Sequence, residues 1–147
     1  ESKGFKIDCE SAISACLLHD VLRYCDFKNF PENSPKIWNQ MRVKYFKKGH
    51  EKAMSEVLKK MGYHKIANLV KKHDFFRVDG LKTIEEKIVF YSDKRVDHDK
   101  VVSLKKRFKE GRKRNFSDRD DMTDIEKAEA KIIKLEKEIN YLLKKQP

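Results

Sequence analysis

Apolar residues recur every three or four positions along most of the chain, which is the period of an α-helix. No stretch alternates convincingly between apolar and polar residues, as a half-buried strand would. The pattern therefore predicts an all-α fold. The expected helices cover residues 8–20, the stretch from 35 to a break at Gly49, 50–61, 64–74, 83–95, 100–110 and 123–142.

Several of these helices begin with residues that favour a helix start. Asp8 is expected to be the N-cap of the first helix. Ser34 followed by Pro35 has the form of an N-cap with proline at the first helical position. Thr83 and Glu86 have the spacing of a capping box. The apolar faces expected for the first two helices are Ile13, Cys16 and Leu17, and then Ile37, Met41 and Tyr45.

The C-terminal part of the chain has a different character. Residues 109–122 are strongly polar and are expected to form a connector, after which Thr123 and Glu126 repeat the capping-box spacing. This predicts a domain over residues 1–114, and a connector with an amphipathic, coiled-coil-like helix over residues 115–147. The helix either folds back on the domain or pairs with a second copy to make a homodimer. Its apolar positions are Ile125, Ala128, Ile132, Leu135, Ile139 and Leu142.

Composition places the chain among small intracellular proteins. It has 147 residues, 39% hydrophobic and 40% charged, which suits one domain with a small core. No segment has the pattern of a secretion signal or a membrane span. The three cysteines form no CxxC pair and are typical of free thiols in a reducing compartment. We therefore expect a soluble, cytoplasmic protein with no membrane partner.

The formal net charge is +11, and the positive excess lies in the middle of the chain. Residues 41–80 have 11 basic and 4 acidic groups, and residues 81–114 have 12 and 6, whereas the two ends are nearly neutral. A positive field of this size favours a partner that carries phosphate. Charge alone does not distinguish a nucleotide from a polymeric nucleic acid.

A set of histidines and aspartates lies at or near the ends of the predicted helices. Imidazole and carboxylate groups together suit divalent transition metals such as Mn, Fe or Zn. A helical bundle can bring such ligands from separate helices to one interior point. From the residues alone, each histidine could equally be a buried or surface group without a metal. The set consists of His19, Asp20, His50, His73 and Asp93.

Four segments of the chain resemble the HD-domain metal-dependent phosphohydrolases. Residues 16–23, with the sequence CLLHDVLR, are similar to the LLHDIGK signature of that family. Gly49–His50–Glu51 and the apolar run after it resemble the second histidine segment, and residues 66–73 resemble the segment with the next histidine. Residues 83–96 resemble the helix that ends in the last aspartate. The resemblance covers about residues 8–108 and implies an HD-like helical bundle.

The resemblance also implies a metal cofactor and its ligands. His19, Asp20 and Asp93 would be the core ligands, with Asp20 as the bridging carboxylate. His50 and His73 would complete a second metal position. The cofactor would be one or two divalent ions, Mn, Fe or another transition metal.

Two further residues would contact the substrate phosphate. Arg23 occupies the position of the basic residue in the signature and would act with Asp20 in catalysis, and Lys94 is a second candidate. The expected activity is hydrolysis of a phosphate ester, in particular of a nucleotide, by metal-activated water. The alternative is an inactive HD scaffold that binds nucleic acid or acts as a regulatory module.

The chain departs from the family pattern in three places. Leu22 stands where the signature has glycine, which narrows the space beside the site. The family has another metal-binding histidine on a helix upstream of HD, and none of the 18 residues before His19 is histidine. That helix is either lost from this protein or lies upstream of Glu1. The long segment 26–48 is expected to form a lid or a substrate wall.

Overall fold

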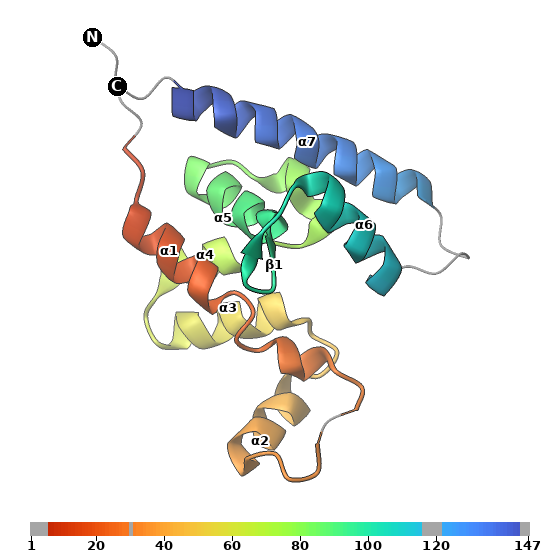
Figure 1. Cartoon of the computed structure of the whole chain (residues 1–147). Helices are drawn as coiled ribbons and strands as arrows, with labels where there is room; N and C mark the ends of the chain where they lie inside the picture. Colours follow the sequence, from red (N-terminus) through yellow and green to blue (C-terminus); the bar gives the residue numbers. More distant parts are fainter. Residues whose placement is uncertain (1–5, 30, 116–121, 145–147) are drawn as a thin grey trace.

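The computed structural model describes residues 6–29, 31–115 and 122–144, which form a helical bundle with one very small hairpin (Figure 1). This confirms the predicted all-α fold, although the sequence pattern did not reveal the hairpin. In chain order the elements are α1 (Cys9–Leu18), η1 (Arg23–Asp26), α2 (Lys36–Tyr45), α3 (His50–Lys60), α4 (His64–Val70), η2 (Phe75–Gly80), α5 (Ile84–Arg95), β1 (Val96–Asp97), β2 (Lys100–Val101), α6 (Leu104–Asn115) and α7 (Met122–Lys144).

Two predicted helix starts are confirmed by side-chain hydrogen bonds. Oδ1 of Asp8 accepts from the backbone N–H of Ser11 at 3.0 Å, which caps α1. The Thr83 hydroxyl accepts from the backbone N–H of Glu86 at 3.3 Å, and Oε2 of Glu86 accepts from the Thr83 N–H at the same distance. These two bonds form the predicted capping box of α5. Both helices lead to predicted metal ligands at their other ends.

Other predicted boundaries differ from the structure. The Ser34 hydroxyl donates to the Pro31 carbonyl, so α2 begins after Pro35 without a side-chain cap. The helix expected over residues 100–110 is displaced, because residues 100–101 pair with 96–97 in the hairpin. Half of the expected connector is helical in α6, whose lysines and arginines are good helix formers. Residues 116–121 of that connector lie outside the described residues.

Of the three residues expected on the buried face of α1, Cys16 packs against the core, but the other two are exposed. Ala12 and Ala15 are buried, whereas Ile13 and Leu17 are 60% and 75% exposed. The two sets lie about 150° apart around the helix axis, which is nearly on opposite sides. Small side chains let α1 approach α4 and α5 closely, and this packing brings the C-terminal end of α1 next to theirs.

Two hydrophobic clusters meet at α5. Val89 belongs to a cluster that also contains buried residues of α1, α3 and α4. Its neighbour Phe90 belongs to a second cluster, which contains buried residues of α6 and α7. Because successive residues of one helix enter both clusters, α5 connects the two halves of the bundle.

Helix α7 lies across α5 and η2 and is folded back on the rest of the chain (Figure 1). Lys87 and Arg95 of α5 form ion pairs with Glu138 and Glu136 of α7, at 2.6 and 3.0 Å. The apolar seam is therefore used within the chain, and formation of a homodimer stays a prediction. The buried seam positions are Ile125, Ala128, Ile132, Leu135 and Ile139.

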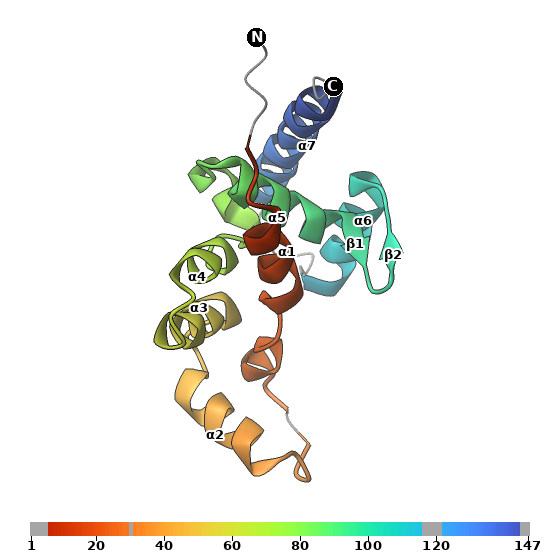
Figure 2. The same cartoon turned by 90° about the vertical axis from the view of Figure 1, so that its left-hand side faces the viewer.

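Helix α2 projects to the side of the molecule farthest from α7 (Figures 1 and 2). Of segment 26–48, none of the described residues lines the pocket that contains Asp20 and His50. The segment therefore forms no wall of this pocket, and its helix α2 packs on η1. The expected role as a lid stays a prediction. Within the described ranges, no helix is both long enough and apolar enough to cross a bilayer.

A candidate metal centre

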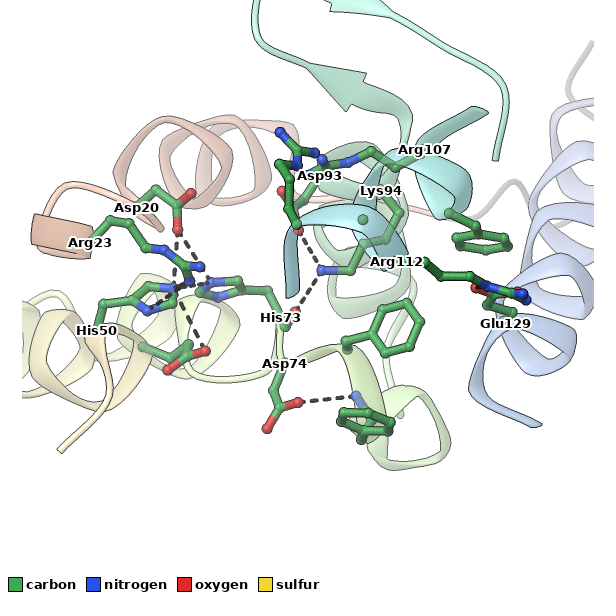
Figure 3. Close-up of a pocket in the computed structure, with 16 residues that line it drawn as sticks. Asp20, Arg23, His50, His73, Asp74, Asp93, Lys94, Arg107, Arg112 and Glu129 are labelled. Atoms are coloured by element: carbon green, nitrogen blue, oxygen red, sulfur yellow. Dashed lines mark hydrogen bonds and ion pairs between the residues drawn. The ribbon is translucent and has the colours of Figure 1, made fainter. Parts of the chain in front are cut away.

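The five side chains predicted as metal ligands come together from four separate parts of the chain. Asp20 lies at their centre, at one end of a pocket of about 460 Å³ (Figure 3). Its Oδ1 is 3.1 Å from Nε2 of His50 and 3.6 Å from Nε2 of His73. Nε2 of His19 lies 3.6 Å from Oδ2 of Asp20 and 3.4 Å from Oδ1 of Asp93. The ends of α1, α3 and α4 thus place three imidazoles around the Asp20 carboxylate, and Asp93 of α5 contacts this cluster through His19.

Two of the imidazoles are anchored through Nδ1 to the backbone in the same way. Nδ1 of His19 donates to the Cys16 carbonyl at 2.7 Å, and Nδ1 of His73 donates to the Val70 carbonyl at 2.6 Å. In each case the acceptor lies three residues earlier, at the end of a helix. A carbonyl can only accept, so the proton is on Nδ1 and Nε2 is the atom directed at the cluster. Metal-binding histidines in proteins are commonly fixed by such a bond.

His50 is held instead by two residues of η1. Oδ2 of Asp26 lies 2.5 Å from Nδ1 of His50 and also accepts from its backbone N–H at 3.4 Å. Nη1 of Arg23 is 3.2 Å from both ring nitrogens. A single atom can be that close to both nitrogens only above the ring face, so this guanidinium nitrogen lies over the imidazole. Asp26 was not predicted, because it lies outside any motif and reaches His50 across 24 positions of sequence.

The electrostatics of the cluster favour a positive charge at its centre. Burial favours the neutral form of Asp20, but contacts with His50 and His73 outweigh this and hold its pKa well below the usual range. Burial likewise favours neutral His19, but Asp93 and Asp20 outweigh it and raise its pKa. Asp20 and Asp26 raise the pKa of His50 against the same opposing effect of burial. The carboxylates are thus arranged to hold cationic partners.

Two overlapping groups in this cluster have the composition of a metal site. The first is His19, Asp20 and His73, and the second is His50, Glu51 and His73. In each group the ligand atoms lie within 4.8 Å of one another. Mixed nitrogen and oxygen donors suit a divalent transition metal, and His73 belongs to both groups. The residues therefore fit one such ion or two neighbouring ions.

Glu51 is the member of these groups that was not predicted, although it directly follows His50. Its position depends on Gly49, which has a φ of +81°. A Cβ atom at Gly49 would lie 3.0 Å from Oε2 of Glu51. Glycine therefore allows α3 to begin at His50 with the Glu51 side chain close to the turn before it.

The two predicted phosphate-binding residues both line the pocket but differ in their surroundings. Arg23 is exposed and lies over His50. Lys94 is largely buried, and its Nζ donates to Oδ2 of Asp93 at 2.6 Å and to the His73 carbonyl at 3.0 Å. Lys94 thus orients a predicted ligand, while the phosphate contacts of both residues stay predictions.

Comparisons of this protein with family models, with curated proteins and with solved structures found no match. The resemblance to HD domains therefore stays a prediction, and the functional interpretation rests on the residues and geometry described above.

Proposed function

We propose that this protein is a metal-dependent phosphohydrolase that cleaves a phosphate ester, in particular that of a nucleotide. One observation carries the proposal. Three imidazoles, each fixed through Nδ1, direct Nε2 toward the carboxylate of Asp20. The ends of α1, α3 and α4 thus bring together nitrogen and oxygen donors that a divalent transition metal binds.

The residues of the cluster have distinct roles in this proposal. His19, Asp20, His50, His73 and Asp93 would hold the metal, and a divalent ion there would lower the pKa of a water and offset phosphoryl charge. The other roles belong to basic side chains that are already oriented by contacts within the protein. Arg23 is held over His50 with its guanidinium facing the pocket, where it can bind a phosphate oxygen. Burial favours the neutral form of Asp93, but His19 and Lys94 both contact it and hold its pKa well below the usual range, so that its carboxylate stays ionised beside His19.

Two measurements on the same preparation test this proposal. Elemental analysis should find Mn, Fe or another transition metal bound to the full chain, and that protein should hydrolyse members of a nucleotide panel. Asp20→Asn should lose metal and activity together. Asp99→Asn is the matched control, since Asp99 is exposed and outside the pocket. A full chain that binds no transition metal and turns over no phosphate ester would contradict the proposal.

A second candidate is binding of nucleic acid without catalysis, which the surface of α2 favours. Lys36, Lys44 and Lys47 are exposed there, and Trp38 and Phe46 are 47% and 40% exposed among them. Proteins bind single-stranded nucleic acids with basic side chains that contact the backbone and aromatic rings on which the bases stack. Filter binding across a salt series should then show an affinity that falls steeply with salt. Absent or salt-independent binding would reject this candidate.

A further inference from the structure

The pocket extends well beyond the metal cluster, and its far end has a different chemistry. Asp20, Arg23 and His50 lie at one end, and Lys94 separates them from a wall built by η2, α6 and α7 (Figure 3). That wall presents aromatic rings and guanidinium groups, which the hydrolysis of a phosphate does not itself require. These residues are Phe75, Phe76, Phe108, Arg107, Arg112 and Arg114.

The aromatic part of the wall is held in a fixed position. The Phe75 ring packs edge-on against Phe76 and Phe108, with centroids 5.2 and 6.3 Å apart. The backbone N–H of Phe76 donates to Oδ1 of Asp74 at 3.0 Å, and Asp74 directly follows the cluster residue His73. The Phe76 ring is nevertheless 53% exposed and lines the pocket. An exposed ring held in this way can stack on a planar group of a ligand.

The guanidinium groups of the wall are not equally neutralised. Arg112 forms a two-pronged ion pair with Glu129 and is balanced by it. Arg107 and Arg114 instead share one carboxylate, that of Asp97, at 3.5 and 3.3 Å. Both contacts are longer than a strong charge-assisted hydrogen bond. One carboxylate facing two guanidiniums leaves a positive charge at this end of the pocket.

We infer that the far end of the pocket is a recognition site for the rest of the substrate. Phe76 stacks on its planar base, and Arg107 and Arg114 bind an anionic group other than the phosphate at the metal cluster. This inference rests on the proposed function. It narrows the substrate class to nucleotides with a base and at least two phosphate groups, and it disfavours sugar phosphates.

Three probes separate these contributions. Ribose 5-phosphate has neither a base nor a second phosphate, AMP adds the base, and ADP adds both. Calorimetry on the full chain, with and without Mn, should show that ADP binds more tightly than AMP and AMP more tightly than ribose 5-phosphate. Where turnover occurs, kcat/KM should follow the same order. Phe76→Leu should lower the affinity for AMP about tenfold and leave the affinity for ribose 5-phosphate unchanged. Phe27→Leu is the control, because Phe27 is 51% exposed but outside the pocket.

The anion site is tested in the same way. Arg114→Gln should lower the affinity for ADP about tenfold more than the affinity for AMP. Lys113→Gln should not, although it removes the same charge, because Lys113 is exposed and lies outside the pocket. The inference is overturned if Phe76→Leu affects ribose 5-phosphate as much as AMP, or if ADP and AMP respond alike to Arg114→Gln. Either result would leave phosphate hydrolysis standing. If the proposed function is wrong, the unmodified chain should instead bind no transition metal and hydrolyse none of the three probes.

Discussion

Asp26 fixes the His50 imidazole from the side opposite the metal cluster, with Oδ2 2.5 Å from Nδ1. The same oxygen accepts from the His50 backbone N–H at 3.4 Å, so the carboxylate holds both the ring and the first residue of α3. This leaves Nε2 of His50 facing Asp20 and Glu51. Carboxylates that orient a metal-binding imidazole in this way contribute to metal affinity although they do not touch the metal.

Asp26→Asn should therefore weaken metal binding without removing a ligand. We expect a loss of about 10–100-fold in Mn affinity, the range found when such orienting residues are changed. Calorimetric titration of the full chain would measure it. The control is Glu32→Gln, since Glu32 is an exposed acidic residue of the same segment. An affinity equal to that of the unmodified protein would show that Asp26 does not position His50 for a metal.

Local signals explain what could be predicted of this site. The N-cap Asp8 and the Thr83–Glu86 box act over three residues, so the chain near them determines the helix start. The histidines likewise lie within short segments at helix ends. Long-range contacts account for what was missed. Asp26 reaches His50 only because η1 lies beside the start of α3, and nothing in either segment indicates this pairing.

Packing between helices explains why two of the three residues expected on the buried face of α1 are exposed. Ile13 and Leu17 are more hydrophobic than Ala12 and Ala15, so periodicity alone favours the wrong side. Which side is buried depends on how closely α4 and α5 approach, and this is a property of the assembled bundle. The spacing of the α7 seam has a related ambiguity, because an intramolecular and an intermolecular partner require the same repeat.

The backbone turn before His50 gives a second prediction, with two glycines as matched controls. Gly49 and Gly62 have φ values of +81° and +89°, so alanine at either position should lower the free energy of unfolding by about 1–2 kcal/mol. A Cβ at Gly49 would meet Glu51 at 3.0 Å, whereas one at Gly62 or Gly80 would meet nothing within 4 Å. Only Gly49→Ala should therefore also weaken metal binding.

Chemical denaturation and calorimetric titration of the three alanine variants would separate strain from displacement of Glu51. Gly80→Ala should leave both stability and metal affinity nearly unchanged. If Gly49→Ala and Gly62→Ala bind metal equally well, Glu51 is not part of the metal centre.

The Glu86 carboxylate gives a prediction about acid stability. Burial opposes its ionisation, but the Lys72 ammonium at 2.6 Å and the backbone N–H groups of Lys82 and Thr83 outweigh this and lower its pKa from the usual 4.5. A carboxyl whose pKa is lower in the folded state stabilises the fold above the unfolded value, and this stabilisation is lost as the pH falls through the folded value.

Glu86→Gln should accordingly lower the free energy of unfolding by about 2 kcal/mol at neutral pH, a value typical of hydrogen bonds to charged groups. The difference from the unmodified protein should shrink progressively below about pH 4.5, where the unfolded chain begins to take up the proton. Urea denaturation from pH 7 to pH 3 would measure this difference. A difference that is independent of pH would assign the loss to packing rather than to the charge.

The last prediction distinguishes the two interpretations of α7. Ile132 is fully buried in the second hydrophobic cluster, and its neighbour Ile133 is 42% exposed. In a helix folded back on its own chain, Ile132→Ala should cost about 2–5 kcal/mol of unfolding free energy, and Ile133→Ala should cost much less. The cost should be the same at every protein concentration, because no second copy takes part. If the seam instead joins two copies, stability would rise with protein concentration, and Ile132→Ala would lower the mass found by sedimentation equilibrium. Measuring denaturation of both variants over a hundredfold range of concentration decides between these outcomes.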